Sequence, residues 1–311
     1  HFLDKADKEQ WRKISNYILR QQSEDGSWGQ YYEAPGDLST SVECYFALKL
    51  AGHCPEAEYM RKAREFILSV GGVPQTRVFT KIWLALFGQW DWKGTPTMPP
   101  ELMLLPTWAP FNIYEFSSWA RGTIVPMLVI LTRHPTCEIP EWAVIDELYP
   151  LSREETDYSL PEPDANWGWP KILYYIDQIL GFYDRIPIHP LRGKAERKII
   201  DWLKDHQERD GSWGGIQPPW VYSLIALHQL GFEMDHPVME QGFNGFEGFV
   251  IEDDETFIVQ PCISPVWDTC LAQIALVESG IPVSSSMIQK STRWLLNRQI
   301  LEPGDWQVRA K

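Results

Sequence analysis

The fold is decided by residues 202–213, Trp-Leu-Lys-Asp-His-Gln-Glu-Arg-Asp-Gly-Ser-Trp. The pattern predicts a helix that ends near Gln207, a tight turn at Gly211, and a tryptophan that folds back onto the helix. Glycine suits such a turn because it tolerates the positive φ at which helices commonly stop. The same order of residues recurs at 17–28 and, with a longer turn, at 294–306. Three copies of one unit indicate a repeat architecture.

A second recurring signature is a helical Ala-Leu pair followed closely by glycine, at Gly52, Gly88, Gly231 and Gly280. Small alanines let helices approach closely, and the glycine permits a left-handed cap. Alternating strand patterns are scarce, and repeated helix pairs bury their apolar faces only by stacking on neighbours. We therefore predict an all-α fold, an α/α barrel or toroid of helix pairs in two concentric rings. An open solenoid is the alternative; the irregular, Pro- and Trp-rich stretch at 90–110 favours the closed form.

Composition limits the possible functions. The 311-residue chain is 44 % hydrophobic and 23 % charged, which is typical of a globular protein. Its formal net charge of −14 disfavours binding to nucleic acid. The five cysteines show no CxxC spacing and the seven histidines no HxH or HExxH pair, so we predict no disulfide framework, metal or cofactor. Because His1 rather than methionine opens the sequence, we expect the chain to be part of a longer protein.

The repeated unit resembles the QW motif of triterpene cyclases. Longer stretches are similar to bacterial squalene–hopene cyclases: RVFT with WLAL (77–86), NIYEF with SWAR (112–121), GSWGGIQPPW (211–220) and ISPVWDT (263–269). The chain is identified as a member of this family over residues 14–308. The resemblance implies a two-barrel enzyme with an apolar cavity between the barrels, in which a DxDD motif on the other barrel protonates squalene. This sequence ends before the place expected for that motif.

The resemblance also implies a division of the chain. Residues 1–250 are expected to form the non-catalytic, cavity-shaping barrel, and residues 251–311 the connection and the first helices of the catalytic barrel. The full-length protein is expected to be an isomerase that cyclises squalene, or a similar linear isoprenoid, to hopene or a related polycyclic triterpene. The isolated chain is expected to be inactive. Relatives act as peripheral proteins on the cytoplasmic side of the membrane, and a homodimer is a further expectation.

Two tryptophans match the cavity residues of the family, Trp119 and Trp267. A polycyclisation cascade produces carbocations that need stabilisation without a nucleophile to trap them. Aromatic faces provide this through the attraction between a cation and the ring quadrupole. The alternative is that both residues are ordinary core aromatics.

A second matching group lies at the expected far end of the cavity. Gln217, flanked by Ile216 and Pro218, could hold the water that removes the last proton, because a neutral amide would not quench the cation early. A polar network behind that water matches the side chains of Glu43, Arg77, Trp83 and Tyr222. Taken without the resemblance, Glu43 and Arg77 read as a partly buried ion pair.

The substrate channel is expected at two places. Phe116 and Ile124 match its constriction, and their spacing of eight residues on one helix would turn both to the same side; ordinary core packing is the alternative. The apolar helix expected at residues 169–183 matches a segment beside a nonpolar plateau that enters one membrane leaflet. Burial inside the barrel is the alternative for this helix.

Residues 252–256, Glu-Asp-Asp-Glu-Thr, resemble an acid or magnesium motif only superficially, and we interpret them as a solvated acidic loop. Two functions from other classes remain open. A lone α/α barrel could bind isoprenoids without catalysis. An inverting glycoside hydrolase could also use such a barrel, with two carboxylates roughly 6.5–9.5 Å apart.

Overall fold

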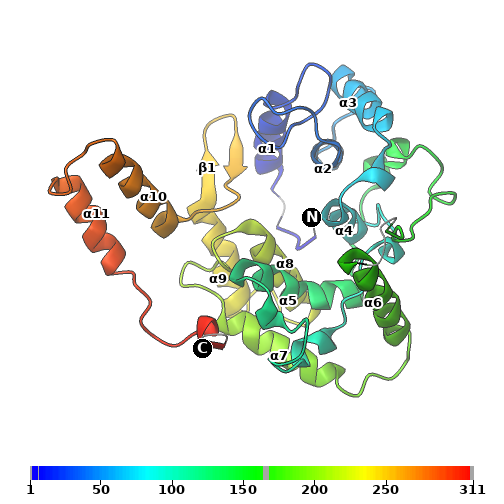
Figure 1. Ribbon diagram of the computed structural model, residues 1–311. Coiled ribbons are helices and arrows are strands. Elements are labelled where there is room, and N and C mark those ends of the chain that lie inside the picture. Colours follow the sequence, from blue (N-terminus) through cyan, green and yellow to red (C-terminus); the bar gives the residue numbers. More distant parts are fainter. Residues whose placement is uncertain (1, 6, 164–167, 309–311) are drawn as a thin grey trace.

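The computed structural model describes residues 2–5, 7–163 and 168–308, and within them the chain is mostly helical (Figure 1). The α-helices are α1 (Lys8–Arg20), α2 (Leu38–Leu50), α3 (Glu58–Ser69), α4 (Val78–Leu86), α5 (Ser118–Arg133), α6 (Trp169–Asp184), α7 (Arg192–Asp205), α8 (Gln217–Gln229), α9 (Pro237–Gly245), α10 (Pro265–Glu278) and α11 (Ser286–Leu296). Short 3-10 helices are η1 (Val73–Gln75), η2 (Trp92–Gly94), η3 (Pro100–Leu104), η4 (Ile113–Glu115), η5 (Glu141–Ala143), η6 (Asp146–Leu148), η7 (Phe246–Phe249) and η8 (Asp305–Val308). Strands β1 (Val250–Glu252) and β2 (Phe257–Val259) form an antiparallel hairpin.

The helices occupy outer and inner positions, as an α/α barrel requires, and they alternate strictly over α1 to α4 and α7 to α9. The inner helices α2, α4, α5 and α8 bury residues around most of their circumference, whereas the outer helices α1, α3 and α7 bury a single face. Outer α1 and α3 pack on α2, and outer α9 packs on α8, which also packs along α5. The predicted all-α barrel of helix pairs is therefore confirmed.

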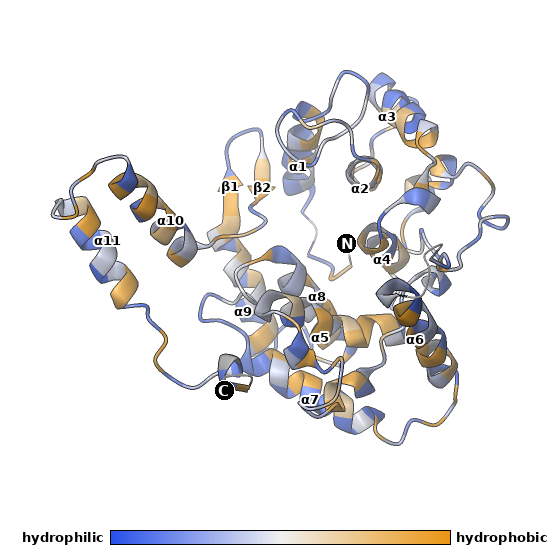
Figure 2. Ribbon diagram, in the orientation of Figure 1, coloured by the Kyte–Doolittle hydropathy of each residue, from blue (hydrophilic) through white to orange (hydrophobic). Residues whose placement is uncertain are grey.

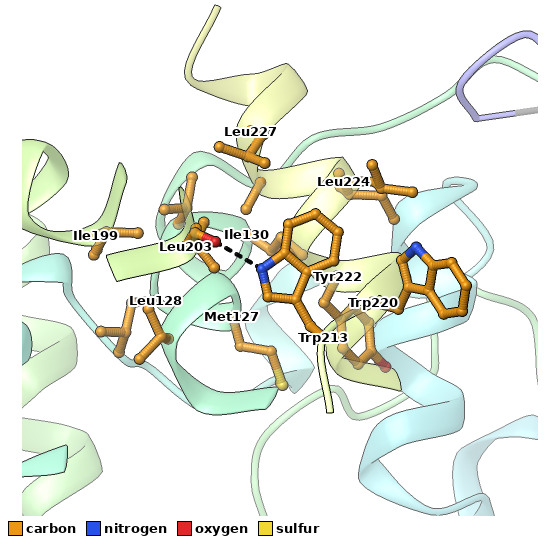
Figure 3. Close-up of a cluster of buried hydrophobic side chains, with 14 of the residues drawn as sticks. Met127, Leu128, Ile130, Ile199, Leu203, Trp213, Trp220, Tyr222, Leu224 and Leu227 are labelled. Atoms are coloured by element: carbon orange, nitrogen blue, oxygen red, sulfur yellow. Dashed lines mark hydrogen bonds between the residues drawn. The ribbon is translucent and has the colours of Figure 1, made fainter. Parts of the chain in front are cut away.

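The tryptophan of each repeat ties an outer helix to the turn that follows it. Trp213 is almost fully buried, and its indole N–H donates a hydrogen bond of 2.8 Å to the carbonyl oxygen of Leu203 on α7 (Figure 3). Trp28 makes the same bond, of 2.7 Å, to the carbonyl oxygen of Ile18 on α1. The prediction that these tryptophans fold back is confirmed for both; the side chain of Trp306 lies outside the described residues.

The glutamines of the first two repeats tie their turns to the next outer helix. The Gln207 amide donates to the carbonyl oxygen of Val238 on α9 (2.8 Å), and the Gln22 amide donates to that of Tyr59 on α3 (2.9 Å). The turn glycines Gly26 and Gly211 have φ of 87° and 90°, as predicted. One local motif therefore joins two successive outer helices, which explains why a short pattern predicts a large architecture.

Two buried clusters form the core. One lies between α5, α7 and α8 and contains Met127, Leu128, Leu203 and Trp220 (Figure 3). The other lies between α2, α3 and α4 around Tyr45. The N-terminal segment runs into the middle of the ring (Figure 1), where Phe2 and Leu3 pack against the first cluster.

The last two helices stand apart from the barrel (Figure 1). Helix α10 packs on α11, yet it has no buried residue along its length. Its surface is hydrophobic along much of the helix (Figure 2), with Trp267, Leu271 and Ile274 exposed. A helix with so much apolar surface normally packs against neighbouring elements, and apart from α11 none of the described residues forms such a layer over α10.

The acidic stretch at 252–256 is the tip of the β1–β2 hairpin rather than an isolated loop. Its carboxylates remain exposed, but Glu252 pairs with Lys13 at 2.5 Å and Glu255 pairs with Arg20 on the same helix, α1. The prediction of a solvated loop is therefore corrected in one respect: the charges attach the hairpin to the first outer helix.

Candidate active site

The far end of the expected cavity is built around the start of α8. Pro218 and Pro219 occupy the first helical turn, where no backbone N–H is needed. The Gln217 amide nitrogen donates to the carbonyl oxygens of Val259 (2.8 Å) and Gln260 (2.9 Å), which belong to the β2 segment. Among the described residues, no hydrogen-bond donor contacts the Gln217 side-chain oxygen, so that oxygen is available to a water or ligand.

Ile216 and Pro218 flank this glutamine differently. Ile216 is half-buried and forms an isolated β-bridge with Cys262, while Pro218 is exposed. The strand-like bridge and the two amide bonds hold the Gln217 side chain against the β2 segment. A glutamine fixed at its nitrogen presents its oxygen in a defined direction.

A buried polar group lies behind α8. The Thr80 hydroxyl donates to a carboxylate oxygen of Glu43 (2.5 Å), and the rings of Trp83 and Tyr222 stack with centroids 5.1 Å apart. Burial raises the pKa of Glu43 above its usual range. Burial, and then the Glu43 charge, raise the pKa of Tyr222. The structure thus brings together three of the four predicted network residues and adds Thr80, which sequence reasoning missed although it stands in the matching RVFT stretch.

The predicted ion pair between Glu43 and Arg77 is wrong. Arg77 is exposed, and its guanidinium pairs with the Asp37 carboxylate at 3.4 Å, while its backbone N–H donates to the Ser39 hydroxyl. Asp37 caps the start of α2 and already accepts hydrogen bonds from Thr40. The arginine therefore stays at the surface, and its charge reaches Glu43 only through space.

The buried Glu43 carboxylate makes stability depend on pH. Because its pKa is raised in the folded state, the folded chain holds this proton to higher pH than the unfolded chain, so its contribution to stability falls as pH rises through that range. Glu43→Gln keeps an acceptor for Thr80 and removes the charge. We expect the difference in melting temperature, variant minus wild type, to become more positive as the pH rises from about 5 to about 8. Glu65→Gln, on the exposed face of α3, is the control; equal changes in both variants would contradict the prediction.

An apolar cavity of about 500 Å³ lies between α5, α6 and the segment that connects α4 to α5. Phe116 and Ile124 both line it, as do Leu128, Leu173 and Leu180. The helical-spacing argument for the first pair is wrong, because α5 begins only at Ser118 and Phe116 precedes it in extended conformation. The two side chains nevertheless line the same cavity, and Ile124 also packs against the first core cluster, so the alternative of core packing holds in part for Ile124.

Asp177 is the acidic side chain in the wall of this apolar cavity. It accepts a hydrogen bond of 2.7 Å from the backbone N–H of Thr97, and burial raises its pKa. This bond links α6 to the segment that closes the cavity on the other side. Sequence reasoning missed it, although a single acid in the middle of an apolar helix was a usable signal.

The outer side of α6 is exposed and hydrophobic. Trp169, Ile179 and Phe182 are exposed by 67 %, 67 % and 71 %, and none of the residues of α6 is fully buried. Burial of this helix inside the barrel, the alternative left open by the sequence, is therefore wrong. No helix in the described part of the chain combines the length and apolar character needed to cross a bilayer.

The two expected cavity tryptophans are not core residues. Trp119, in the first turn of α5, is 66 % exposed, and Trp267, in the first turn of α10, is 68 % exposed. The alternative that both are ordinary core aromatics is therefore wrong. Within residues 2–5, 7–163 and 168–308, no three His, Cys, Asp or Glu side chains come together as metal ligands would.

The sequence matches two domain families. The squalene–hopene cyclase N-terminal domain matches residues 1–255, and the squalene–hopene cyclase C-terminal domain matches residues 263–311. The first match alone covers most of the sequence.

Proteins that are similar in sequence to this chain include squalene–hopene cyclases and a dammaradiene synthase. The squalene–hopene cyclase of Alicyclobacillus acidocaldarius is 44 % identical over 310 residues, which are 99 % of this chain and 48 % of the relative. The dammaradiene synthase of Dryopteris crassirhizoma is 37 % identical over 93 % of this chain and 42 % of its own length. A squalene–hopene cyclase of Schizosaccharomyces japonicus is 35 % identical over 99 % of this chain and 48 % of its own length. This chain thus spans about half the length of these relatives. With a helix-pair barrel, QW turns and two matching domains, the chain belongs to the squalene–hopene cyclase family.

Proposed function

We propose that this chain is the cavity-shaping part of a triterpene cyclase that converts squalene, or a similar linear isoprenoid, to hopene or a related polycyclic product. The observation that carries the proposal is the apolar cavity at Phe116 and Ile124, in a chain of this family, beside an exposed apolar helix. A pure hydrocarbon offers no group for hydrogen bonding. Its binding therefore depends on apolar walls, which this cavity has.

Helix α6 is the proposed contact with the membrane. Its exposed face would enter one leaflet as a peripheral, monotopic contact on the cytoplasmic side, where a substrate dissolved in the bilayer can reach the cavity directly. The large exposed side chains Trp169, Leu173 and Phe182 support this proposal because they form an apolar surface without a covering element. A homodimer stays a prediction.

Residues 1–250 would form the non-catalytic barrel, and residues 251–311 the connection and the first helices of the catalytic barrel. The uncovered apolar surface of α10 supports this division. Trp119 and Trp267 would then face the cavity between the barrels, where their π faces stabilise cationic intermediates. The initiating acid would come from the other barrel.

Gln217 is the proposed termination residue. With its nitrogen bound to two carbonyl oxygens, its side-chain oxygen would orient the water that takes the last proton, assisted by the backbone carbonyl of Pro218. Glu43, Thr80, Trp83 and Tyr222 would support that water from behind. A neutral amide suits this place because a carboxylate would capture or quench a nearby cation.

The test is squalene turnover in detergent, measured by mass spectrometry for the 311-residue chain and for the full-length protein. We expect turnover by the full-length protein and none by the chain alone. Turnover by the chain alone would place an acid within these residues. Binding of squalene without turnover by the full-length protein would favour the isoprenoid-binding alternative. The glycoside-hydrolase alternative is superseded by the family assignment.

A further inference from the structure

Arg121 connects the channel wall to the far end of the chain. It lies in the first turns of α5, only 8 % exposed, and its guanidinium donates a hydrogen bond of 2.8 Å to the backbone carbonyl oxygen of Phe116. The same guanidinium lies 5.5 Å from the centre of the Tyr114 ring, a cation–π distance. One arginine therefore contacts both the backbone of the constriction residue and the ring of Tyr114, two positions before it.

The charge of Arg121 is balanced by a residue far along the sequence. Asp305, in η8 after α11, has a carboxylate oxygen 3.3 Å from the Arg121 Nε, in an ion pair without hydrogen-bond geometry. The same oxygen lies 3.0 Å from Nε2 of His206, whose ring stacks on Trp202 of α7 with centroids 3.8 Å apart. Figure 1 shows this final segment returning to the barrel beside α7.

A buried guanidinium without a counter-charge is strongly unfavourable. If Asp305 is absent or displaced, Arg121 gains by turning toward water, and the Phe116 carbonyl then loses its donor. Burial, and then the charge of Asp305, raise the pKa of Tyr114. The position of η8 is therefore linked to the conformation of residues 114–116.

We propose that Arg121 is a positioning residue that sets the channel constriction at Phe116, and that Asp305 makes this setting depend on the seating of the segment that follows α11. The inference rests on the proposed function, since it assigns the constriction to a substrate channel. It adds a coupling between the entry of a long linear isoprenoid and the placement of the chain that leads to the other barrel.

The first experiment measures kcat/KM for squalene in the full-length protein. We expect Arg121→Gln and Asp305→Asn each to lower kcat/KM by about tenfold with the number of rings in the product unchanged. Arg133→Gln is the matched control. Arg133 belongs to the same helix but lies away from the cavity, and its guanidinium pairs with the Glu196 carboxylate at 2.8 Å. In a Phe116→Ala background, Arg121→Gln should cause no further loss. Equal losses in the control, or an undiminished loss in that background, would overturn the positioning role.

The second experiment is hydrogen exchange, which does not require turnover. Both Arg121→Gln and Asp305→Asn should increase amide exchange in residues 114–121, whereas Arg133→Gln should leave it unchanged. Unchanged exchange in Asp305→Asn would overturn the coupling even if squalene is consumed. Conversely, a wild-type protein that ignores squalene but shows the expected exchange would refute the proposed function and retain the link between Asp305 and the constriction.

Discussion

We expect Gly211→Ala to lower the free energy of unfolding by about 4 kcal/mol, from left-handed backbone strain together with a steric clash. The glycine has φ of 90°, and a Cβ there would lie 2.0 Å from the carbonyl oxygen of Gln241 and 2.8 Å from its carbonyl carbon. Both atoms belong to the backbone of α9, so the contact cannot be relieved by turning a side chain. The variant would push apart two helices that the repeat joins.

Gly231→Ala is the control for this variant. Gly231 has almost the same φ, 93°, but a Cβ there would meet no atom within 4 Å. Its replacement should cost only the backbone strain, about 1 kcal/mol. Gly26→Ala, whose Cβ would lie 2.4 Å from the Lys62 carbonyl carbon, should behave like Gly211→Ala. Urea denaturation of the three variants measures the difference; equal values for Gly211 and Gly231 would show that the close approach to α9 is not limiting.

The repeats could be predicted from sequence because their interactions are local. The indole of Trp213 bonds ten residues back, and the positive φ of the turn glycine is a property of the turn itself. The glutamine bond to the next outer helix, from Gln207 to Val238, spans one repeat. A pattern that contains its own partners can be recognised without knowledge of the tertiary structure, so the barrel follows from the sequence.

Partners far apart in the chain could not be predicted in this way. The sequence predicts a pair of Arg77 with Glu43, whereas the structure pairs Arg77 with Asp37, which caps α2 at the surface. The acidic hairpin pairs with α1 about 240 residues earlier, and sequence spacing contains no trace of that pairing. Phe116 and Ile124 line one cavity, but not through the predicted helical spacing, because a short 3-10 helix and a break precede α5.

The largest expected change in product follows from Trp267→Ala in the full-length protein. Removing a desolvated cation–π contact costs roughly 2 kcal/mol. If the barrier for further ring closure rises by this amount relative to the barrier for early proton loss, the ratio of the two outcomes shifts about 30-fold. We therefore expect products with fewer rings to become the main products from squalene, measured by gas chromatography with mass spectrometry. Trp142→Ala, which removes an exposed tryptophan of η5, is the control and should leave the products unchanged.

The same variant also separates two roles of Trp267. If the ring stabilises a cation, total squalene consumption should persist while the product changes, because initiation requires an acid and not this indole. If the ring instead serves as packing surface of α10 for the other barrel, consumption should fall with the product pattern intact. Trp267→Phe sharpens the distinction, since phenylalanine retains a weaker π face and most of the apolar area. Retention of multi-ring products by Trp267→Phe but not by Trp267→Leu, which keeps apolar area without a π face, would assign the role to the aromatic face.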